Sequence, residues 1–202
     1  MRPKEPGGRG PAEHARRDQI VAAANDHFQQ YGYDKTTVGD LAKAIGFSTA
    51  YIYKFFDSKQ SIGEAICGIC LDEISVDIRR IAVSDQPAAE RLRAIFAALA
   101  RHARDISVRK SRLQDMVAAA HRERWRSFAD HEAALREIVT LVVEEGRRAG
   151  EFERKTPIDE TCRGILLVLE PFWNPTLWVG RLDELDGQAV SVAALVLRSL
   201  AS

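Results

Sequence analysis

The 202-residue sequence has only three cysteines, and their arrangement argues against a metal site. Cys67 and Cys70 form a Cys-x-x-Cys pair, and Cys162 is isolated. A structural zinc ion takes about four ligands, and no second pair or His-x-x-x-His partner accompanies this one. A redox-active pair normally occurs in a thioredoxin-like context. We therefore interpret the pair as small apolar residues one helical turn apart, and we expect no metal and no cofactor.

Catalytic signatures are also lacking. There is no Gly-x-Ser-x-Gly elbow and no phosphate-binding glycine loop. His131-Glu132 begins like the zinc-protease motif, but Leu135 stands where the second histidine belongs. We expect no catalytic residues and no enzymatic activity.

Long apolar runs are missing as well. No stretch is long enough to span a bilayer, and the charged N-terminus has no apolar segment behind it, unlike a secretory signal. These absences favour a cytoplasmic protein without a membrane partner. No alternating strand pattern and no internal repeat is visible, whereas helical spacing of apolar residues recurs along the chain. The sequence therefore predicts an all-α protein.

Residues 36–59 predict two short helices around a tight turn. Thr37 can cap the first helix with Asp40 three residues later, a variant of the capping box. The apolar face of this helix comprises Val38, Leu41, Ala42 and Ile45. Gly46 follows at once, where a left-handed residue ends a helix. Ser48 can cap a second helix from Thr49 to about Phe56.

The second helix of this pair has a polar outer face. Thr49, Tyr51, Tyr53 and Lys54 supply hydroxyls, rings and a charge, which suit phosphates and base edges. A helix, a glycine turn and a second helix with such a face is the helix-turn-helix plan, whose second helix enters the major groove. The alternative is a helical hairpin with a solvated polar face. The formal net charge of 0 does not itself indicate nucleic acid.

Residues 15–66 resemble the DNA-binding domain of the TetR family of transcriptional regulators. The resembling residues are Ala24, Phe28, Gly32, Tyr33, Thr36, Thr37, Val38, Asp40, Leu41, Ala42, Ala44, Ile45, Gly46, Ser48, Ile52, Tyr53, Phe55, Phe56 and Lys59. The resemblance implies that Lys59 contacts the DNA backbone. The expected DNA-binding residues are Thr36, Thr37, Ser48, Thr49, Ala50, Tyr51, Tyr53, Lys54 and Lys59.

The expected organisation has three parts. Residues 1–12, rich in proline, glycine and arginine, form a flexible basic arm that either remains solvated or follows the DNA. Residues 13–62 form the three-helix helix-turn-helix domain, and residues 63–202 form a helical effector-binding and dimerisation domain. The further helices are expected at 58–82, from Pro87, at 108–120, at 122–149, from a Thr156 cap to Pro171, and at 184–200.

Aromatic and histidine side chains in the second domain predict an effector site. The candidates are His102, His121, Trp125, Phe128, Phe172 and Trp173. Each singly suits an ordinary helical core, but together they suit an apolar pocket between bundle helices, and the resemblance implies an effector there. The basic residues between Arg101 and Arg112 suit an anionic effector or, more simply, a solvated face.

We expect a homodimeric repressor of a pseudo-palindromic double-stranded DNA operator, released by a small-molecule effector. The resemblance favours repression, and two-fold half-sites require a two-fold protein. The predicted dimer interface is formed by residues 158–170 and 184–200, and the apolar stripe of the last helix comprises Val190, Ala193, Ala194, Leu197 and Leu200. Two alternatives stay open. One is an effector-free DNA-binding protein that organises the chromosome, and the other is a ligand-binding module or enzyme on a reused fold.

Overall fold

The computed structural model describes residues 11–109, 114–174, 177 and 182–201. Over these ranges the chain is helical, with no strand beyond an isolated bridge between Phe152 and Ala201. The α-helices are α1 Pro11–Tyr31, α2 Val38–Ile45, α3 Thr49–Ile52, α4 Lys59–Ala82, α5 Ala88–Arg109, α6 Gln114–Arg122, α7 Arg126–Ala149, α8 Ile158–Leu169 and α9 Leu185–Leu200. The all-α prediction is confirmed. None of the described helices combines the length and apolarity needed to cross a lipid bilayer.

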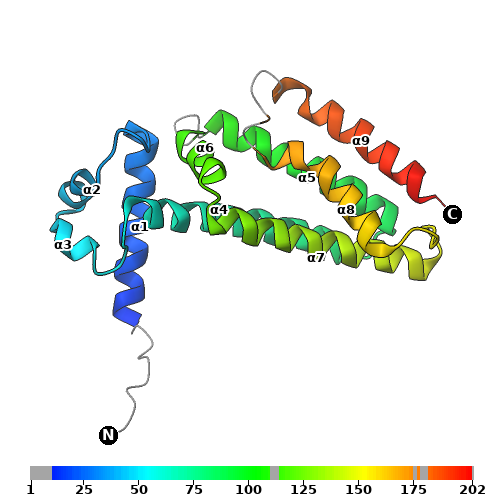
Figure 1. Cartoon of the computed structure of the whole chain (residues 1–202), viewed down its shortest axis with the longest axis horizontal. Helices are drawn as coiled ribbons and strands as arrows, with labels where there is room; N and C mark the ends of the chain where they lie inside the picture. Colours follow the sequence, from blue (N-terminus) through cyan, green and yellow to red (C-terminus); the bar gives the residue numbers. More distant parts are fainter. Residues whose placement is uncertain (1–10, 110–113, 175–176, 178–181, 202) are drawn as a thin grey trace, which may run out of the picture.

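The three N-terminal helices form a unit at one end of the molecule (Figure 1). Helix α1 packs against α2 and α4, and α2 packs against α3. Their shared core is made of fully buried residues, namely Ile20, Ala24, Phe28, Leu41 and Ile52. Helix α1 begins at Pro11, two residues before the predicted boundary, and the rest of the predicted arm lies outside the described residues.

Helix α4 joins this unit to the second domain. It leaves the N-terminal helices and runs alongside α7 (Figure 1), with α5 also packed against it. One face of α4 buries Ile66, Leu71, Ile74 and Ile78 at helical spacing. The helix is continuous from Lys59 to Ala82, so one element contacts both the N-terminal helices and the second domain.

Helices α5, α7, α8 and α9 complete the second domain. Helix α9 packs against α5, and α8 packs against α7. Phe152 fills the space beside Gly146, where a methyl group would lie 2.3 Å from the ring. The Glu153 amide donates to the Leu200 carbonyl over 2.8 Å, so the end of α9 is fixed beside the turn after α7.

Several predicted helix details are wrong. Thr156 does not cap α8; its amide donates to Glu153, and Pro157 occupies the cap position without a side-chain hydrogen bond. Val190 is 69% exposed. The buried stripe of α9 is instead Leu185, Ala189, Ala193, Val196 and Leu200. Val190 follows Ala189 directly, so it lies about 100° of rotation away from that stripe. The prediction failed because α9 has apolar residues on more than one face.

The connections around α6 also differ from the prediction. Helix α5 runs to Arg109 and α6 covers Gln114–Arg122, whereas the predicted helix spanned 108–120; residues 110–113 lie outside the described ranges. The predicted helix 122–149 begins later, at Arg126. Arg124 has a φ of 53°, and this left-handed residue ends α6 so that Trp125 can begin α7.

Candidate nucleic-acid interface and interior pocket

The turn between α2 and α3 is built as the sequence predicts. The Thr37 hydroxyl accepts from the Asp40 amide over 3.1 Å, and the Asp40 carboxylate accepts from the Thr37 amide over 2.9 Å. The Thr37 hydroxyl also donates to the Asp40 carboxylate over 2.7 Å, and this hydrogen bond, with the one from the Thr37 amide, holds the pKa of Asp40 below its usual value. Gly46 ends α2 with a φ of 76°. Together these groups fix where the chain enters α3.

Helix α3 is shorter than predicted. The Ser48 hydroxyl accepts from the Tyr51 amide over 3.1 Å, which confirms the predicted cap. After Ile52 the chain continues in tighter turns, with Lys54 N–H donating to the Tyr51 carbonyl over 3.2 Å and Phe55 N–H to the Ile52 carbonyl over 2.9 Å. The change from α-helical to three-residue spacing explains why the α-helix ends at Ile52 although the chain still coils to Phe55.

The outer face of α3 and the turn after it contains most of the predicted DNA-binding side chains. Thr49, Ala50, Tyr53 and Lys54 are all exposed, Tyr53 by 50%. Tyr51 is half-buried, because its ring packs against Phe47 and Phe55 at centroid distances of 4.9 and 5.4 Å. The exposed hydroxyl and ammonium groups can donate to phosphates or base edges, and the Lys54 ammonium lies 5.6 Å from the centroid of the Tyr51 ring.

The three capping and turn hydroxyls have internal partners. Thr36 is only 2% exposed, and its hydroxyl donates to the Gly32 carbonyl over 2.8 Å. Its side chain is therefore not presented to a DNA backbone in this conformation. Thr37 and Ser48 are exposed but cap α2 and α3.

Lys59 is tied to the loop between α1 and α2. Its ammonium donates to the Tyr33 carbonyl over 3.0 Å and lies 4.3 Å from the centroid of the Tyr33 ring. Burial raises the pKa of Tyr33 to about 12. Lys59 therefore fixes the start of α4 to the unit of three N-terminal helices, a role other than the DNA-backbone contact that the resemblance implies.

Trp125 joins the same loop to the second domain. Its ring meets Tyr33 edge-on with centroids 5.7 Å apart, and its Nε1 donates to Glu123 over 3.0 Å. The ring lies directly over Gly63 of α4, where a methyl group would come within 2.5 Å of Trp125 Cη2. Trp125, predicted as an effector ligand, is thus buried in a joint between α4, the α1–α2 loop and the start of α7.

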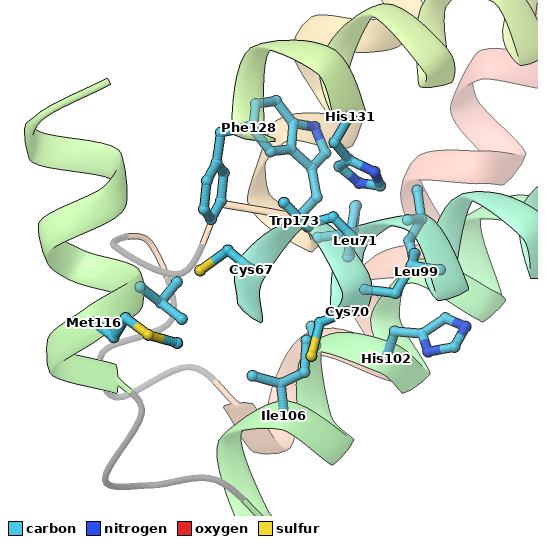
Figure 2. Close-up of a pocket in the computed structure, with 14 residues that line it drawn as sticks. Cys67, Cys70, Leu71, Leu99, His102, Ile106, Met116, Phe128, His131 and Trp173 are labelled. Atoms are coloured by element: carbon cyan, nitrogen blue, oxygen red, sulfur yellow. The ribbon is translucent and has the colours of Figure 1, made fainter. Parts of the chain in front are cut away.

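An interior pocket lies between α4, α5, α6, α7 and the 3₁₀ turn Glu170–Phe172 that follows α8 (Figure 2). Four predicted effector residues line it, namely His102, Phe128, Phe172 and Trp173. The other lining residues are Cys67, Cys70, Leu71, Ile74, Leu99, Ala103, Ile106, Met116, Val117 and His131. The cavity of about 50 Å³ holds a few water-sized groups, so a larger ligand requires side chains to move.

His121 and Trp125 are not brought to this pocket. His121 packs edge-on to Phe128 with centroids 6.4 Å apart, and its Nε2 lies 3.4 Å from Asn174 Nδ2. The ten lining residues that the sequence did not predict include Cys67, Cys70 and His131. Helical spacing could have found them, since Cys67, Cys70, Leu71 and Ile74 follow one stripe of α4 and His131 lies three residues after Phe128.

The polar groups of the pocket are few. His131 is 3% exposed, and its Nδ1 lies 2.8 Å from the Ser75 hydroxyl. Burial lowers the pKa of His131 to about 4. His102 Nε2 lies 3.0 Å from Asp77 Oδ2, and this hydrogen bond lowers the pKa of Asp77. Among the described residues no cluster of His, Cys, Asp and Glu could hold a metal, and no disulfide forms.

Comparisons with known proteins match both halves of the chain. The family profile described as "Bacterial regulatory proteins, tetR family" matches residues 20–66, and that described as "Tetracyclin repressor-like, C-terminal domain" matches residues 88–188. The HTH-type transcriptional repressor KstR2 of Rhodococcus jostii is 25% identical over 193 residues, which are 93% of this chain and 92% of that protein.

Other relatives match in part or in fold. The biofilm operon negative regulator IcaR of Staphylococcus aureus is 39% identical over 59 residues, 29% of this chain and 32% of that protein. A TetR/AcrR regulator structure from Thermobifida fusca has a TM-score of 0.68 at 25% identity, covering 91% of this chain and 97% of that one. A regulator structure from Pectobacterium atrosepticum, at 20% identity, shares the fold with a TM-score of 0.75 over 96% and 98% of the two chains.

Proposed function

This chain belongs to the TetR family of bacterial regulatory proteins, and we propose on that basis that it is a transcriptional repressor which a small-molecule effector releases from its operator. The observation that carries the proposal is α4, which is tied to the DNA-binding unit through Lys59 and lines the interior pocket with Cys67, Cys70 and Leu71. The relatives named repressors support the sign of regulation. Such a regulator acts in the cytoplasm and needs no catalytic activity.

The DNA contact is assigned to α3 and the turn that follows it. The exposed side chains Thr49, Tyr53 and Lys54 face solvent from a segment whose caps fix its direction. The test is to select an operator from a random duplex pool and compare its dissociation constant with that of a scrambled duplex at one salt concentration. Tyr53→Ala should reduce the ratio of the two constants. Equal affinity of the wild-type protein for both duplexes would contradict the proposal.

The homodimer is assigned to α8 and α9. Apolar side chains on these helices remain in solvent in the single chain, including Leu167 at 65%, Val190 at 69% and Leu195 at 59%. The two helices flank an apolar groove that Gly187 and Ser191 help to line, and such small residues permit close helix packing. Covering this surface in a stable dimer buries on the order of 2,000 Å² in total. A two-fold dimer would place two α3 helices on the half-sites of a pseudo-palindrome.

The effector site is assigned to the interior pocket. An inducer must bind the DNA-free conformation more tightly than the DNA-bound one, and operator DNA must weaken the inducer by the same factor. A coupling of about 1–3 kcal/mol corresponds to roughly 5- to 150-fold. The test titrates a pocket ligand with and without saturating operator. Identical dissociation constants would show that the ligand is not an inducer.

The two alternatives give other outcomes. A chromosome-organising protein without an effector would show no saturable ligand binding in the pocket and little preference among duplexes. A ligand-binding module or enzyme on a reused fold would bind its ligand with the same affinity whether or not operator DNA is present. An enzyme would also convert that ligand to a product. The family matches over both halves of the chain support the repressor instead.

A further inference from the structure

Two buried nitrogen atoms in the pocket have no hydrogen-bond partner among the described residues. They are Nε2 of His131 and Nε1 of Trp173. Both side chains line the pocket, whose remaining surface is largely apolar. Leaving a buried polar group unsatisfied is costly, and unsatisfied groups inside a ligand pocket indicate where a ligand supplies the missing partners.

The hydrogen bonds around His131 indicate which of its two ring nitrogens carries the proton. The Ser75 hydroxyl has one hydrogen, which it donates to the Leu71 carbonyl over 2.9 Å. The same oxygen lies 2.8 Å from His131 Nδ1 and therefore accepts from it. On this hydrogen-bond pattern we assign the His131 proton to Nδ1, which leaves the lone pair of Nε2 for a ligand. Because burial keeps the pKa of His131 near 4, the ring is neutral at pH 7.

Trp173 supplies the complementary group. The indole Nε1–H can only donate, and Figure 2 shows this nitrogen on the side of the ring that faces His131. The two rings lie edge-to-face with centroids 6.3 Å apart. Both residues line the same pocket, and a hydroxyl that reaches both nitrogens can accept from Trp173 and donate to His131. The pocket therefore presents one donor and one acceptor side by side.

We propose that the effector is an uncharged, mainly apolar molecule with a hydroxyl group, which bridges Trp173 Nε1–H and His131 Nε2 inside the pocket. This deepens the proposed function and rests on the pocket being the effector site. A hydroxyl both accepts and donates, so it satisfies both nitrogens at once. An ether or ketone satisfies Trp173 alone. A carboxylate would be repelled by the Nε2 lone pair of neutral His131. The Asp77 carboxylate beside His102, a residue that lines the pocket, adds a negative charge that also disfavours an anion.

The apolar body of this ligand would contact the rest of the lining. Leu71, Ile74, Leu99 and Phe128 line the same pocket as the two nitrogens. A water molecule could bridge the same donor and acceptor, and a hydroxyl that displaces it reproduces its hydrogen bonds, whereas an ether does not. The hydroxyl preference therefore holds whether or not the pocket is hydrated before binding.

The test compares head groups on fixed carbon skeletons. Calorimetric titration of the full chain without DNA would use 1-decanol, 1-methoxynonane and decanoic acid, and in parallel 2-naphthol, 2-methoxynaphthalene and 2-naphthoic acid. We expect the alcohol of at least one series to bind about tenfold more tightly than its ether, the worth of roughly one buried hydrogen bond. The carboxylate should bind most weakly. An ether or carboxylate that binds as tightly, or no saturable binding by either alcohol, would overturn the proposal.

Variants assign the preference to the two nitrogens. His131→Phe and Trp173→Phe should each reduce the alcohol-to-ether ratio to within about twofold, while Trp125→Phe, outside the pocket, should leave it unchanged. If both pocket variants keep the full ratio, these nitrogens do not bind the hydroxyl. Operator release is then measured separately. A carboxylate that binds and releases DNA refutes the hydroxyl inference alone, whereas an alcohol that binds with the expected preference and leaves operator affinity unchanged refutes the effector function.

Discussion

Gly63 lies where α4 meets Tyr33 of the DNA-binding unit and Trp125 of the second domain, and adding a methyl group there tests whether that contact matters. In Gly63→Ala the new carbon would lie 2.5 and 2.8 Å from two ring atoms of Trp125 and 3.2 Å from Tyr33. Something must shift, and overpacking of this kind costs about 1–3 kcal/mol. Replacing a helical glycine by alanine also contributes about 1 kcal/mol of helix stability.

Gly68 of the same helix provides a matched control, because no atom lies within 4 Å of a methyl group added there. Gly68→Ala should therefore stabilise the protein by about 0.5–1 kcal/mol. The difference between the two variants isolates the overpacking cost of about 1–3 kcal/mol, which corresponds to several degrees in melting temperature for a chain of this size. Thermal unfolding followed by far-ultraviolet circular dichroism measures it.

The functional effect of Gly63→Ala should follow from the displaced ring. Moving Trp125 moves Tyr33, to which Lys59 and the α1–α2 loop are attached, so we expect a lower operator affinity than in Gly68→Ala. Adding Trp125→Phe, which removes the two clashing ring atoms, should restore part of both the stability and the affinity. If Gly63→Ala and Gly68→Ala have equal stability and equal operator affinity, this contact does not couple the two domains.

Four further outcomes are expected. Val190→Glu should produce monomers by analytical ultracentrifugation and abolish operator binding without loss of helix content, since this side chain is 69% exposed; a variant that stays dimeric places the interface elsewhere. Lys59→Ala should lower the affinity for all duplexes and also lower the melting temperature, because it removes the contact with the Tyr33 carbonyl. An unchanged melting temperature would show that this contact does not stabilise the fold. Cys67→Ala with Cys70→Ala should keep operator affinity in oxidant and reductant alike, and oxidant-dependent loss confined to the wild type would reveal a redox switch. His131 has a folded-state pKa of about 4 against 6.5 in the unfolded chain, so the unfolded state binds the extra proton and up to about 3 kcal/mol of stability is lost as pH falls from 6.5 to 4; His131→Phe should remove that part of the acid sensitivity.

Local signals in the sequence predicted the helix-turn-helix closely. Thr37 and Asp40 cap α2, Gly46 ends it in the left-handed region and Ser48 caps α3, all as expected. Each of these features depends on residues within four positions of one another, so the chain itself determines them. Gly150 ends α7 for the same reason, with a φ of 79°.

The roles of side chains that meet across helices could not be predicted in the same way. Trp125 and Phe128 are three residues apart, yet Trp125 packs on Gly63 while Phe128 lines the pocket. Trp125 is the extended N-cap residue of α7, whereas Phe128 lies inside the helix, and neither composition nor periodicity indicates the left-handed turn at Arg124 that comes before them. Thr36 shows the same limit, because a hydroxyl suited to DNA instead donates to a carbonyl four residues earlier.

Helix α9 shows why apolar periodicity can assign the wrong face. Ala189, Val190, Ala193 and Val196 are all apolar, so more than one stripe at helical spacing is available. Packing against α5 selects the stripe with Ala189 and Ala193 and leaves Val190 in solvent. The choice depends on a partner helix far away in the sequence.

The unbroken course of α4 also limits how such proteins can diversify by recombination. Because one helix belongs to both domains, a crossover inside Lys59–Ala82 that adds or removes a single residue would rotate the two halves by about 100° and shift them by 1.5 Å. Changes of about seven or eleven residues would restore the angle to within about 20°. New pairings of an operator-reading unit with a different sensory domain are therefore viable only when the exchanged segments keep the helix in register.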